Sequence, residues 1–334
     1  MEKILVIHQG ALGDVILSFP ALVALNRERE PRLAILCKDQ VGQVARDLRV
    51  VATHFALESA RFCGLFAKDM PHGMKAFLDH YDRIVSIGFS DDMSHHIRQH
   101  HRGQTYRITP RPSAEKEIHV ADHITRHMQA NGLLRNSNDW GIRELKIEDR
   151  RSKIRARVSS LWHPVIEKTP SLRAQDVVLI HPGAGSRRKR WAVDNFMTVA
   201  HAMRDMNGAQ VIFLTGPAES DLLPLVKKQA QGQFQIHPIE DLSEVMTFMR
   251  AARCFIGNDS GLAHLAAIMG VPTVAIFGPS SPRRWAPLGK AVKVLRGASE
   301  CAPCFEIAKA NCDAPQCLTG VSVDMALDAV KELA

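Results

Sequence analysis

One stretch decides the fold: NDSGLAHLAAIMGVPTVAIFGP, which runs from Asn258 to Pro279. The apolar run Arg253–Gly257 comes before it and predicts a short buried strand. Between Leu262 and Met269 the apolar residues recur at helical spacing, and a Gly-Val-Pro sequence ends that helix. Val271–Phe277 predicts a second strand, closed by Gly-Pro. A strand, a helix and a strand in this order predict an α/β fold with a parallel sheet.

The helix in this unit begins at a turn of small, hydrogen-bonding residues, Asn258 to Gly261. The unpaired backbone N–H groups at such a helix start can hold a phosphate. Asp259 can equally serve as the N-cap of the helix, which is the commoner role for a single Asp-Ser-Gly turn. The turn by itself therefore leaves both interpretations open.

Length and composition favour a globular protein of two domains. The chain has 334 residues, 46% of them hydrophobic and 23% charged, which allows two separate cores. The net charge of +8 favours anionic partners such as nucleotide sugars, acidic lipid headgroups or nucleic acid, although a basic surface can also serve solubility alone. No apolar run reaches the length of a membrane span, and the first residues indicate a strand rather than a signal peptide. A cytoplasmic protein is expected.

The chain opens with a strand at Lys3–His8, a glycine-containing loop at Gln9–Asp14 and a helix at Val15–Arg29 that Pro20 should kink. This order is typical of a doubly wound domain, but the glycines do not have the spacing of a dinucleotide-binding loop. Asp14 lies at the carboxyl end of the first strand, where open α/β sheets bind their ligands. On local grounds, binding and helix capping are equally good interpretations of Asp14.

The rest of the first half alternates strands and helices, with strands expected at Leu33–Cys37, Val50–Phe55 and Arg83–Ile87. Gly88–Pro112 is polar and poorly periodic, and its adjacent histidine pairs lack the accompanying ligands of a metal site. A solvated loop region that faces a ligand is therefore expected there, and its arginines would suit a phosphorylated or acidic ligand. The domain boundary should fall in the polar stretch Asn136–Pro170, with a helix over Arg150–Trp162.

The second half repeats the strand–helix rhythm and carries two further ligand loops. After the strand Asp176–His181, the loop Gly183–Arg190 has two glycines, a serine and four consecutive cations, a good cradle for an anion. After the strand Gln210–Leu214, the loop Thr215–Glu219 ends in a carboxylate that can bind ribose hydroxyls or cap the next helix. These loops and Asn258–His264 should converge on one edge of the sheet, facing the Gly10–Asp14 loop across a cleft.

Taken together, these motifs resemble glycosyltransferase family 9, the bacterial ADP-heptose:lipopolysaccharide heptosyltransferases. The residues that carry the resemblance bracket nearly the whole chain in order: Lys3–Ile7 with Leu12–Val15 and Pro20; His181–Gly183 with Lys189–Trp191; Thr215, Gly216 and Glu219; and Asn258–His264 through Phe277–Pro279. The resemblance implies the GT-B fold, with two Rossmann-like domains. We expect an acceptor-binding domain at residues 1–160, a nucleotide-sugar domain at 161–320, and a terminal helix at 321–334 that packs back on the first domain.

The resemblance also implies the roles of individual residues. Asp14 matches the catalytic aspartate, a general base for the acceptor hydroxyl, and Lys189 matches the lysine on the donor phosphates. The remaining donor-binding residues that it implies are Ser186, Arg190, Thr215, Gly216, Glu219, Asp259, Ser260, Gly261 and His264. Ser186 is the looser assignment, because the loop length varies there.

The implied reaction transfers heptose from ADP-heptose to a hydroxyl of the lipopolysaccharide inner core. The family needs no divalent metal, which agrees with the absence of an Asp-x-Asp pair here. Lys189 and the helix start at Ser260 would stabilise the charge that grows on the leaving phosphate. A monomer that touches the cytoplasmic face of the inner membrane is expected.

Four cysteines lie within seventeen residues: Cys301, Cys304, Cys312 and Cys317. In a reducing compartment they can form a structural zinc site, although their spacing is not that of a standard zinc ribbon. A disulfide pair and plain thiols are the alternatives, and the resemblance implies only that a cysteine-rich loop occurs at this position in the family.

Two other functions stay open. The first is an enzyme of the same fold that uses another nucleotide sugar or acceptor glycan, or a GT-B epimerase. The second is a nucleic-acid-binding protein, suggested only by the pI of about 9.2 and the Arg187–Arg190 run. The sequence lacks the interleaved aromatic residues that such proteins use, so no nucleic-acid partner is expected.

Overall fold

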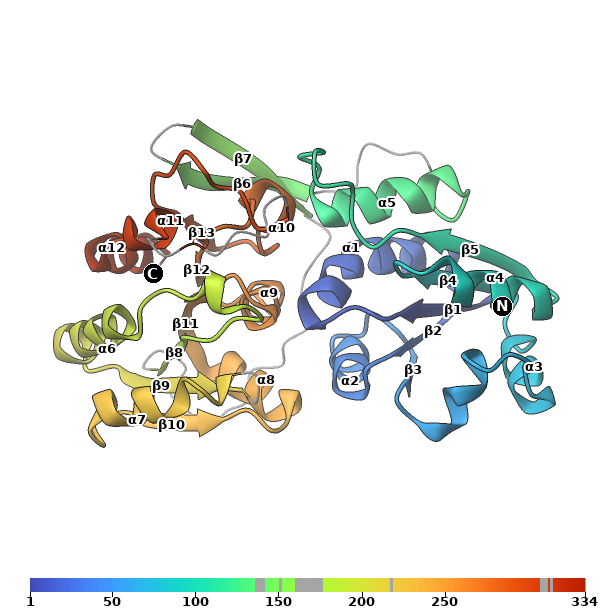
Figure 1. Cartoon of the computed structure of the whole chain (residues 1–334), viewed down its shortest axis with the longest axis horizontal. Helices are drawn as coiled ribbons and strands as arrows, with labels where there is room; N and C mark the ends of the chain where they lie inside the picture. The colour runs from blue at the N-terminus through green and yellow to red at the C-terminus, as the bar shows by residue number, and fades with distance from the viewer. Residues whose placement is uncertain are drawn as a thin grey trace. The chain divides into compact units, whose positions relative to one another are not determined.

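The computed structural model describes residues 1–135, 142–149, 152–159, 177–216, 219–306, 312 and 315–333. The chain forms two compact units, Met1–Trp140 and Gly141–Ala334 (Figure 1). The boundary between them falls within the predicted stretch Asn136–Pro170. It lies about 20 residues before residue 160, where the first domain was expected to end, because the strands that follow residue 141 pair with the second sheet.

The first unit is built on a five-stranded sheet in the order β3-β2-β1-β4-β5. Its strands are β1 (Lys3–His8), β2 (Arg32–Cys37), β3 (Thr53–Ala56), β4 (Arg83–Ile87) and β5 (Gln104–Ile108). Every neighbouring pair is parallel, and β1 lies in the centre with Ile7 beside Ser86 of β4. The central strands are continuous buried apolar runs because both faces of a parallel sheet are covered.

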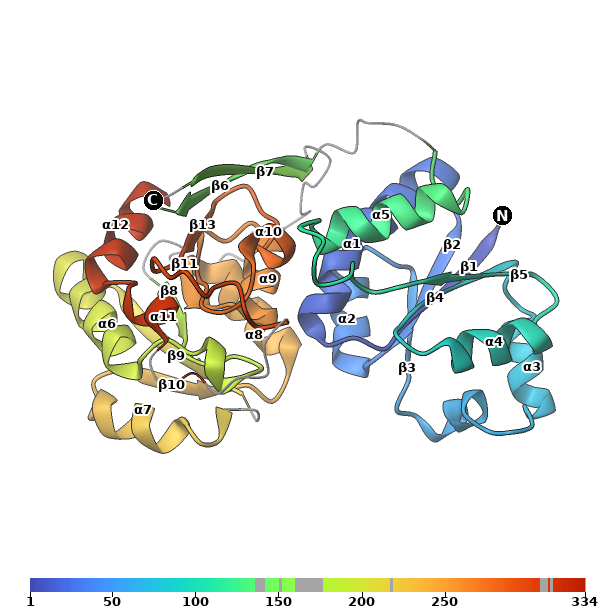
Figure 2. The same ribbon diagram turned by 45° about the horizontal axis from the view of Figure 1, so that its top comes forward.

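Helices cover both faces of this sheet (Figure 2). One layer holds α1 (Leu12–Arg29), α2 (Asp39–Asp47) and α5 (Val120–Ala130), and the other holds η1 (Ala60–Leu65), α3 (His72–Leu78) and α4 (Asp91–His100). The second layer buries Phe62, Met74 and Ile97 against Leu5 and Ile7 of β1.

The stretch Gly88–Pro112, which we expected to be a loop region, instead contains α4 and β5. Only three residues of α4 are buried, namely Met93, Ser94 and Ile97, so its apolar stripe is too narrow to stand out in the sequence. The edge strand β5 reads Gln-Thr-Tyr-Arg-Ile and buries only its last residue. Both elements are therefore held by packing and pairing with β4 rather than by a strong local pattern.

The second unit has an eight-stranded sheet in the order β10-β9-β8-β11-β12-β13-β6-β7. Its parallel strands are β8 (Val177–His181), β9 (Gln210–Thr215), β10 (Gln235–Pro238), β11 (Ala252–Asn258), β12 (Thr273–Ile276) and β13 (Val292–Leu295). The edge is an antiparallel hairpin of β6 (Ile142–Asp149) and β7 (Ser152–Ser159), joined to β13 through Ile147.

This hairpin corrects two predictions. The helix expected over Arg150–Trp162 is strand β7 where the structure describes it, from Ser152 to Ser159. Because β6 pairs with β13, residues 142–159 belong to the second unit and not to the first. The sequence of β7 does alternate, with Ile154, Ala156 and Val158 between basic residues, which is a strand pattern that the helix prediction overlooked. The assignment to the second sheet depends on the long-range pairing of β6 with β13.

The second sheet is also covered on both faces (Figure 1). The helices α6 (Val193–Asn207) and α12 (Val323–Leu333) lie on one face, and α8 (Leu242–Ala251) and α9 (Gly261–Ile268) lie on the other. Four shorter helices complete the unit: η2 (Arg187–Lys189), α7 (Leu223–Ala230), α10 (Pro282–Trp285) and α11 (Gln316–Thr319).

The terminal helix α12 packs on the sheet and helices of the second unit. Its residues Ala326, Ala329 and Val330 are buried in one cluster with residues of α6, β12 and β13. An amphipathic pattern predicts which face of a helix is buried, but not which partner buries it.

Within the described part of the chain, no helix combines the length and the apolar character that a membrane span requires.

Candidate active site

The loops that follow β8, β9 and β11 lie next to one another at the carboxyl edge of the second sheet, because these strands are neighbours in the order β9-β8-β11. They are His181–Arg190, Thr215–Glu219 and Asn258–Gly261, the ligand loops that the sequence singles out, although residues 217 and 218 lie outside the described residues. Ligands of open α/β sheets bind at this edge.

Asn258 fastens the loop after β8 to the end of β11. Its side chain is fully buried, and its Oδ1 accepts a hydrogen bond of 2.9 Å from the backbone N–H of Trp191. Its Nδ2 donates to the carbonyl oxygens of Pro182 at 2.8 Å and Gly183 at 3.3 Å. Both ends of the basic loop are thus held by one amide, and the buried Trp191 anchors the loop further by donating from Nε1 to the Val321 carbonyl at 3.0 Å.

Lys189 and Asp259 form an ion pair in which Nζ lies 2.8 Å from Oδ2. The side chain of Lys189 is 18% exposed and that of Asp259 is 5% exposed, so both charges are largely withdrawn from water. Asp259 is not the N-cap of α9, because Ser260 occupies that position. The capping interpretation of Asp259 is therefore wrong: the carboxylate holds the ammonium of a lysine seventy residues earlier in the chain.

His181, the last residue of β8, connects the three loops. Its Nδ1 lies 3.3 Å from the hydroxyl of Ser260, and its Nε2 lies 3.8 Å from Oε2 of Glu219. The ring is 3% exposed. The sequence motif includes His181 without giving it a role, since nothing local indicates that a histidine at a strand end will contact two distant loops.

Glu219 is turned into the protein rather than toward solvent. It is 5% exposed, and its Oε2 accepts a hydrogen bond of 2.9 Å from the backbone N–H of Gly216. Burial raises the pKa of this carboxyl, but hydrogen bonding and charge from His181, the Gly216 N–H and Arg190 together leave the pKa below its usual value. Glycine at position 183 leaves room for this carboxylate, because a Cβ atom there would lie 2.2 Å from Cγ of Glu219 and would displace its side chain.

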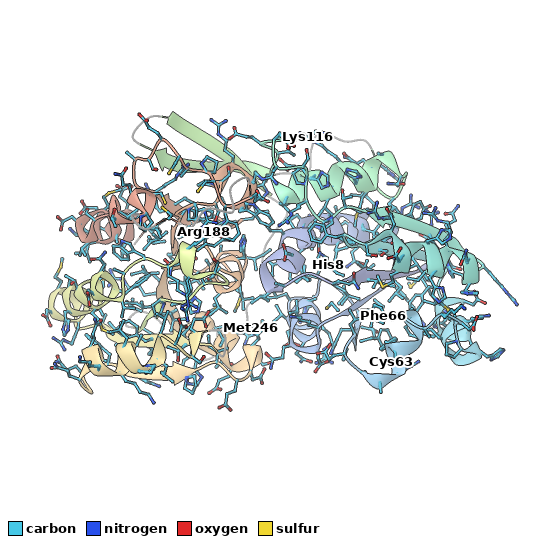
Figure 3. The ribbon with its side chains drawn as sticks, viewed as in Figure 1. His8, Cys63, Phe66, Lys116, Arg188 and Met246 are labelled. Carbon is cyan, nitrogen blue, oxygen red and sulfur yellow. The ribbon has the colours of Figure 1, made fainter. Side chains whose placement is uncertain are left out.

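The four cations of the loop after β8 do not have the same surroundings. Arg190 makes two hydrogen bonds through Nη1 to the carboxylate of Asp221, at 3.1 and 2.9 Å, and Arg187 pairs with the same carboxylate at 3.0 Å. Arg188, labelled in Figure 3, and Lys189 lie over the ring of Phe305 instead. Ser186 is the N-cap of the short helix η2, and its carbonyl accepts from the Lys189 N–H at 3.0 Å.

The remaining residues of the predicted donor site line the same strand ends. Thr215 ends β9 and is 4% exposed, and its hydroxyl has no hydrogen-bond partner among the described residues. Gly261 and His264 lie in the first turn of α9, with His264 4% exposed. Helix-start amides beside a lysine ammonium make a site suited to an anion such as a diphosphate.

Asp14 lies in the first unit, in the first turn of α1 after the carboxyl end of β1. Its Oδ2 accepts a hydrogen bond of 3.0 Å from the backbone N–H of Ala11, so the carboxylate does cap the helix. The same loop is tied to His8, labelled in Figure 3, whose Nδ1 accepts from the Gly10 N–H at 3.0 Å. Burial lowers the pKa of His8 to about 4, although a backbone hydrogen bond with Asp14 opposes this shift.

The clustered cysteines are free thiols, as are the other three cysteines of the chain. Burial raises the pKa of Cys317, and the nearby Cys304, Cys301 and Cys312 raise it further. Four thiols suit zinc chemically, yet no three His, Cys, Asp or Glu side chains in the described ranges are grouped so that they could hold a metal ion.

Two units, each built on a mainly parallel sheet, give the chain the GT-B fold of solved glycosyltransferases. The profile of glycosyltransferase family 9 (heptosyltransferase) matches residues 76–314, and the chain belongs to this family.

Curated relatives match over a shorter stretch. Lipopolysaccharide heptosyltransferase 3 of Escherichia coli is 34% identical over 119 residues, which make up 34% of each chain. Lipopolysaccharide heptosyltransferase 2 of Escherichia coli strain K12 is 32% identical over 114 residues, or 32% of each chain. The matched region thus spans about a third of the length of these relatives.

Solved structures share the fold over the whole chain. A family 9 glycosyltransferase from Veillonella parvula superposes with a TM-score of 0.73 at 18% identity, covering 100% of this chain and 98% of that one. The heptosyltransferase WaaC of Escherichia coli, solved with ADP, gives a TM-score of 0.72 at 14% identity, covering 99% and 100%. These likenesses confirm the GT-B fold predicted from the sequence.

Proposed function

We propose that this protein transfers a heptose from ADP-heptose to a hydroxyl group of the lipopolysaccharide inner core. The observation that carries the proposal is the pairing of Lys189 with Asp259 at the start of α9, which places a fixed ammonium beside helix-start amides. Membership of family 9 supports the sugar transfer, and the E. coli relative solved with ADP supports this nucleotide. The same site on another nucleotide sugar or acceptor glycan is the alternative.

In this proposal, the second unit holds the donor and stabilises its leaving group. As the bond between the sugar and the diphosphate breaks, negative charge grows on the departing phosphate. Lys189 and the backbone N–H groups at Ser260 and Gly261 would stabilise that charge, because they are already oriented before the reaction begins. Thr215 and Glu219 would contact the nucleoside part, since Thr215 ends the neighbouring strand and Glu219 lies in the loop after it.

Asp14 would take the proton from the acceptor hydroxyl as that oxygen attacks the anomeric carbon. Its carboxylate is oriented by the Ala11 N–H and sits at the carboxyl edge of the first sheet. A positioned general base contributes a rate factor of about 10² to 10⁴. The acceptor would rest on the same edge, where Arg111 lies 4.8 Å over the ring of Phe89, a side chain that is 66% exposed. An aromatic face beside a guanidinium suits an anionic sugar.

The proposed reaction requires no metal, and the enzyme would act as a monomer in the cytoplasm, with peripheral contact to the inner membrane that carries its acceptor. Structural zinc at the four cysteines is a separate proposal. Metal analysis of untagged protein tests it, and a protein without stoichiometric metal would exclude it.

Calorimetric titration with ADP, UDP and GDP, followed by an assay of ADP release with lipopolysaccharide-core acceptors, tests the proposal. Of the three nucleotides, ADP should bind most tightly. Lys189→Met should weaken ADP binding at least tenfold. Lys228 is an exposed lysine on α7, and Lys228→Met should leave ADP binding unchanged. Asp14→Asn should lower kcat by about 10² to 10⁴ with ADP affinity retained, whereas Asp47→Asn should have no effect. Near-normal turnover of the Asp14 variant would remove it from the role of base.

A further inference from the structure

The short segment Cys304–Glu306 is fixed against the ligand edge of the second sheet from two sides. The backbone N–H groups of Cys304 and Phe305 both donate to the Pro279 carbonyl just after β12, at 2.9 and 3.0 Å. Glu306 pairs with Arg284 at 2.7 Å and accepts a hydrogen bond of 3.3 Å from Nε1 of Trp285. Arg284 is 2% exposed, so the anchor on α10 is a buried one.

This fixation places the ring of Phe305 against the basic loop. Nζ of Lys189 lies 4.4 Å from the ring centroid, and the guanidinium carbon of Arg188 lies 5.6 Å from it. Nη2 of Arg188 also reaches Sγ of Cys304 at 3.5 Å. The ammonium of Lys189 therefore has two fixed contacts, the carboxylate of Asp259 and the face of Phe305.

The two contacts have different consequences for a bound anion. Asp259 attracts the ammonium but adds a negative charge that repels phosphate. The ring attracts the ammonium through its quadrupole without adding any net charge, and its apolar body displaces water from one side of the cation. Less water around the ammonium strengthens its attraction for a phosphate oxygen.

We propose that Phe305 is a positioning residue for the diphosphate of the donor: it holds the ammonium of Lys189 in place and partly desolvated, so that Lys189 binds phosphate more tightly. The proposal rests on the proposed function of the Lys189 site and extends it to a segment that follows β13 in the chain. Phe305 acts through Lys189, so its contribution should vanish when Lys189 is removed.

A double-mutant cycle on the full-length protein tests this, with ADP as the titrant in calorimetry. Phe305→Leu should weaken ADP binding about 3- to 10-fold, and Phe305→Tyr, which keeps the aromatic face, should bind within about twofold of the native protein. In the Lys189→Met background, Phe305→Leu should cause no further loss. If Phe305→Leu does not fold, Phe305→Met replaces it, because it also removes the ring and has a similar volume.

Two results would overturn the proposal. The first is an ADP affinity in Phe305→Leu equal to that of the native protein. The second is an equal loss of ADP affinity from Phe305→Leu with and without Lys189, which would show that Phe305 has only a structural role. In steady-state assays the donor KM should rise in Phe305→Leu while kcat stays within about twofold, and a fall in kcat alone would also count against it. A native protein that binds neither ADP nor the other nucleoside diphosphates would refute the proposed function and this proposal with it. A native protein that binds ADP with no coupling refutes this proposal only.

Discussion

Protonation of His8 should make the first unit less stable in mild acid. His8 ends the central strand β1 and is fully buried, and its Nδ1 is an acceptor for the Gly10 N–H under the Asp14 loop. Burial lowers the pKa of His8 to about 4, whereas an unfolded histidine has a pKa of about 6.5. Between these two values the unfolded chain binds a proton that the folded chain refuses, so the stability due to neutral His8 is complete above about pH 6.5 and is lost as the pH falls toward 4.

The size of the effect follows from the two pKa values. Between pH 7 and pH 5 the difference in proton binding should remove about 2 kcal/mol from the free energy of unfolding, and about 3 kcal/mol once the pH reaches 4. A stability of about 5 to 15 kcal/mol is usual for a domain, so a loss of about 2 kcal/mol is readily measured. In His8→Gln the side-chain oxygen can still accept from Gly10, but the titrating group is gone.

Hydrogen exchange of peptides that cover β1 and β4 measures this effect within the first unit and does not depend on how the second unit unfolds. The native protein should lose about 2 kcal/mol more protection than His8→Gln between pH 7 and pH 5, after correction for the intrinsic exchange rate. Equal pH dependence in the two proteins, or a His8 ring resonance that titrates near pH 6.5, would show that the ring is not held neutral by burial.

Further predictions concern the second unit. Gly183→Ala should lower the free energy of unfolding by about 1–3 kcal/mol and weaken ADP binding, because its Cβ would lie 2.2 Å from Cγ of Glu219. At Gly185 a Cβ would meet nothing within 4 Å, so Gly185→Ala should change neither thermal unfolding nor the ADP affinity measured by calorimetry. Asn258→Ala should cost about 3 kcal/mol in urea unfolding, since it leaves a buried N–H and a buried carbonyl unpaired. Asn131 is the matched control, because its amide caps α5 but is exposed. Asn131→Ala should lower the free energy of unfolding by less than about 1 kcal/mol. Equal losses in the two variants would refute this account of Asn258.

The sequence was sufficient for the features that depend on local pattern. Continuous apolar runs such as Lys3–His8 and Val177–His181 could only be buried strands of a parallel sheet, and helices between them followed from their spacing. Because the carboxyl ends of parallel strands share one edge, the order of strands and loops along the chain was enough to predict that the loops after His181, Thr215 and Asn258 meet.

The features that the sequence did not predict depend on contacts between distant residues. Nothing near Asp259 indicates that its partner is Lys189, and the local pattern favoured a helix cap. The edge strand β5 is short and buries only its last residue, and it is stabilised by pairing with β4. The alternation in β7 indicates a strand, but nothing local shows that its hairpin joins the second sheet. Phe305 follows β13 in a cysteine-rich segment, and only the fold shows that it contacts the phosphate-binding lysine proposed above.

The balance of charges around the proposed donor site indicates how such a site could bind a diphosphate and still release the product. The four consecutive cations from Arg187 to Arg190 lie near three carboxylates. Asp221 pairs with Arg187 and Arg190, and Asp259 pairs with Lys189. Glu219 lies beside His181, and the charge of Arg190 helps to lower its pKa. A loop that looks strongly basic in the sequence therefore carries only a small net charge in the fold. Most of the attraction for phosphate must then come from oriented groups, namely the helix-start amides of α9 and one positioned ammonium, rather than from bulk positive charge. Oriented groups can favour the geometry of the breaking bond over that of the free nucleotide, whereas unpaired cations would bind the departing nucleoside diphosphate as tightly as the transition state and slow its release.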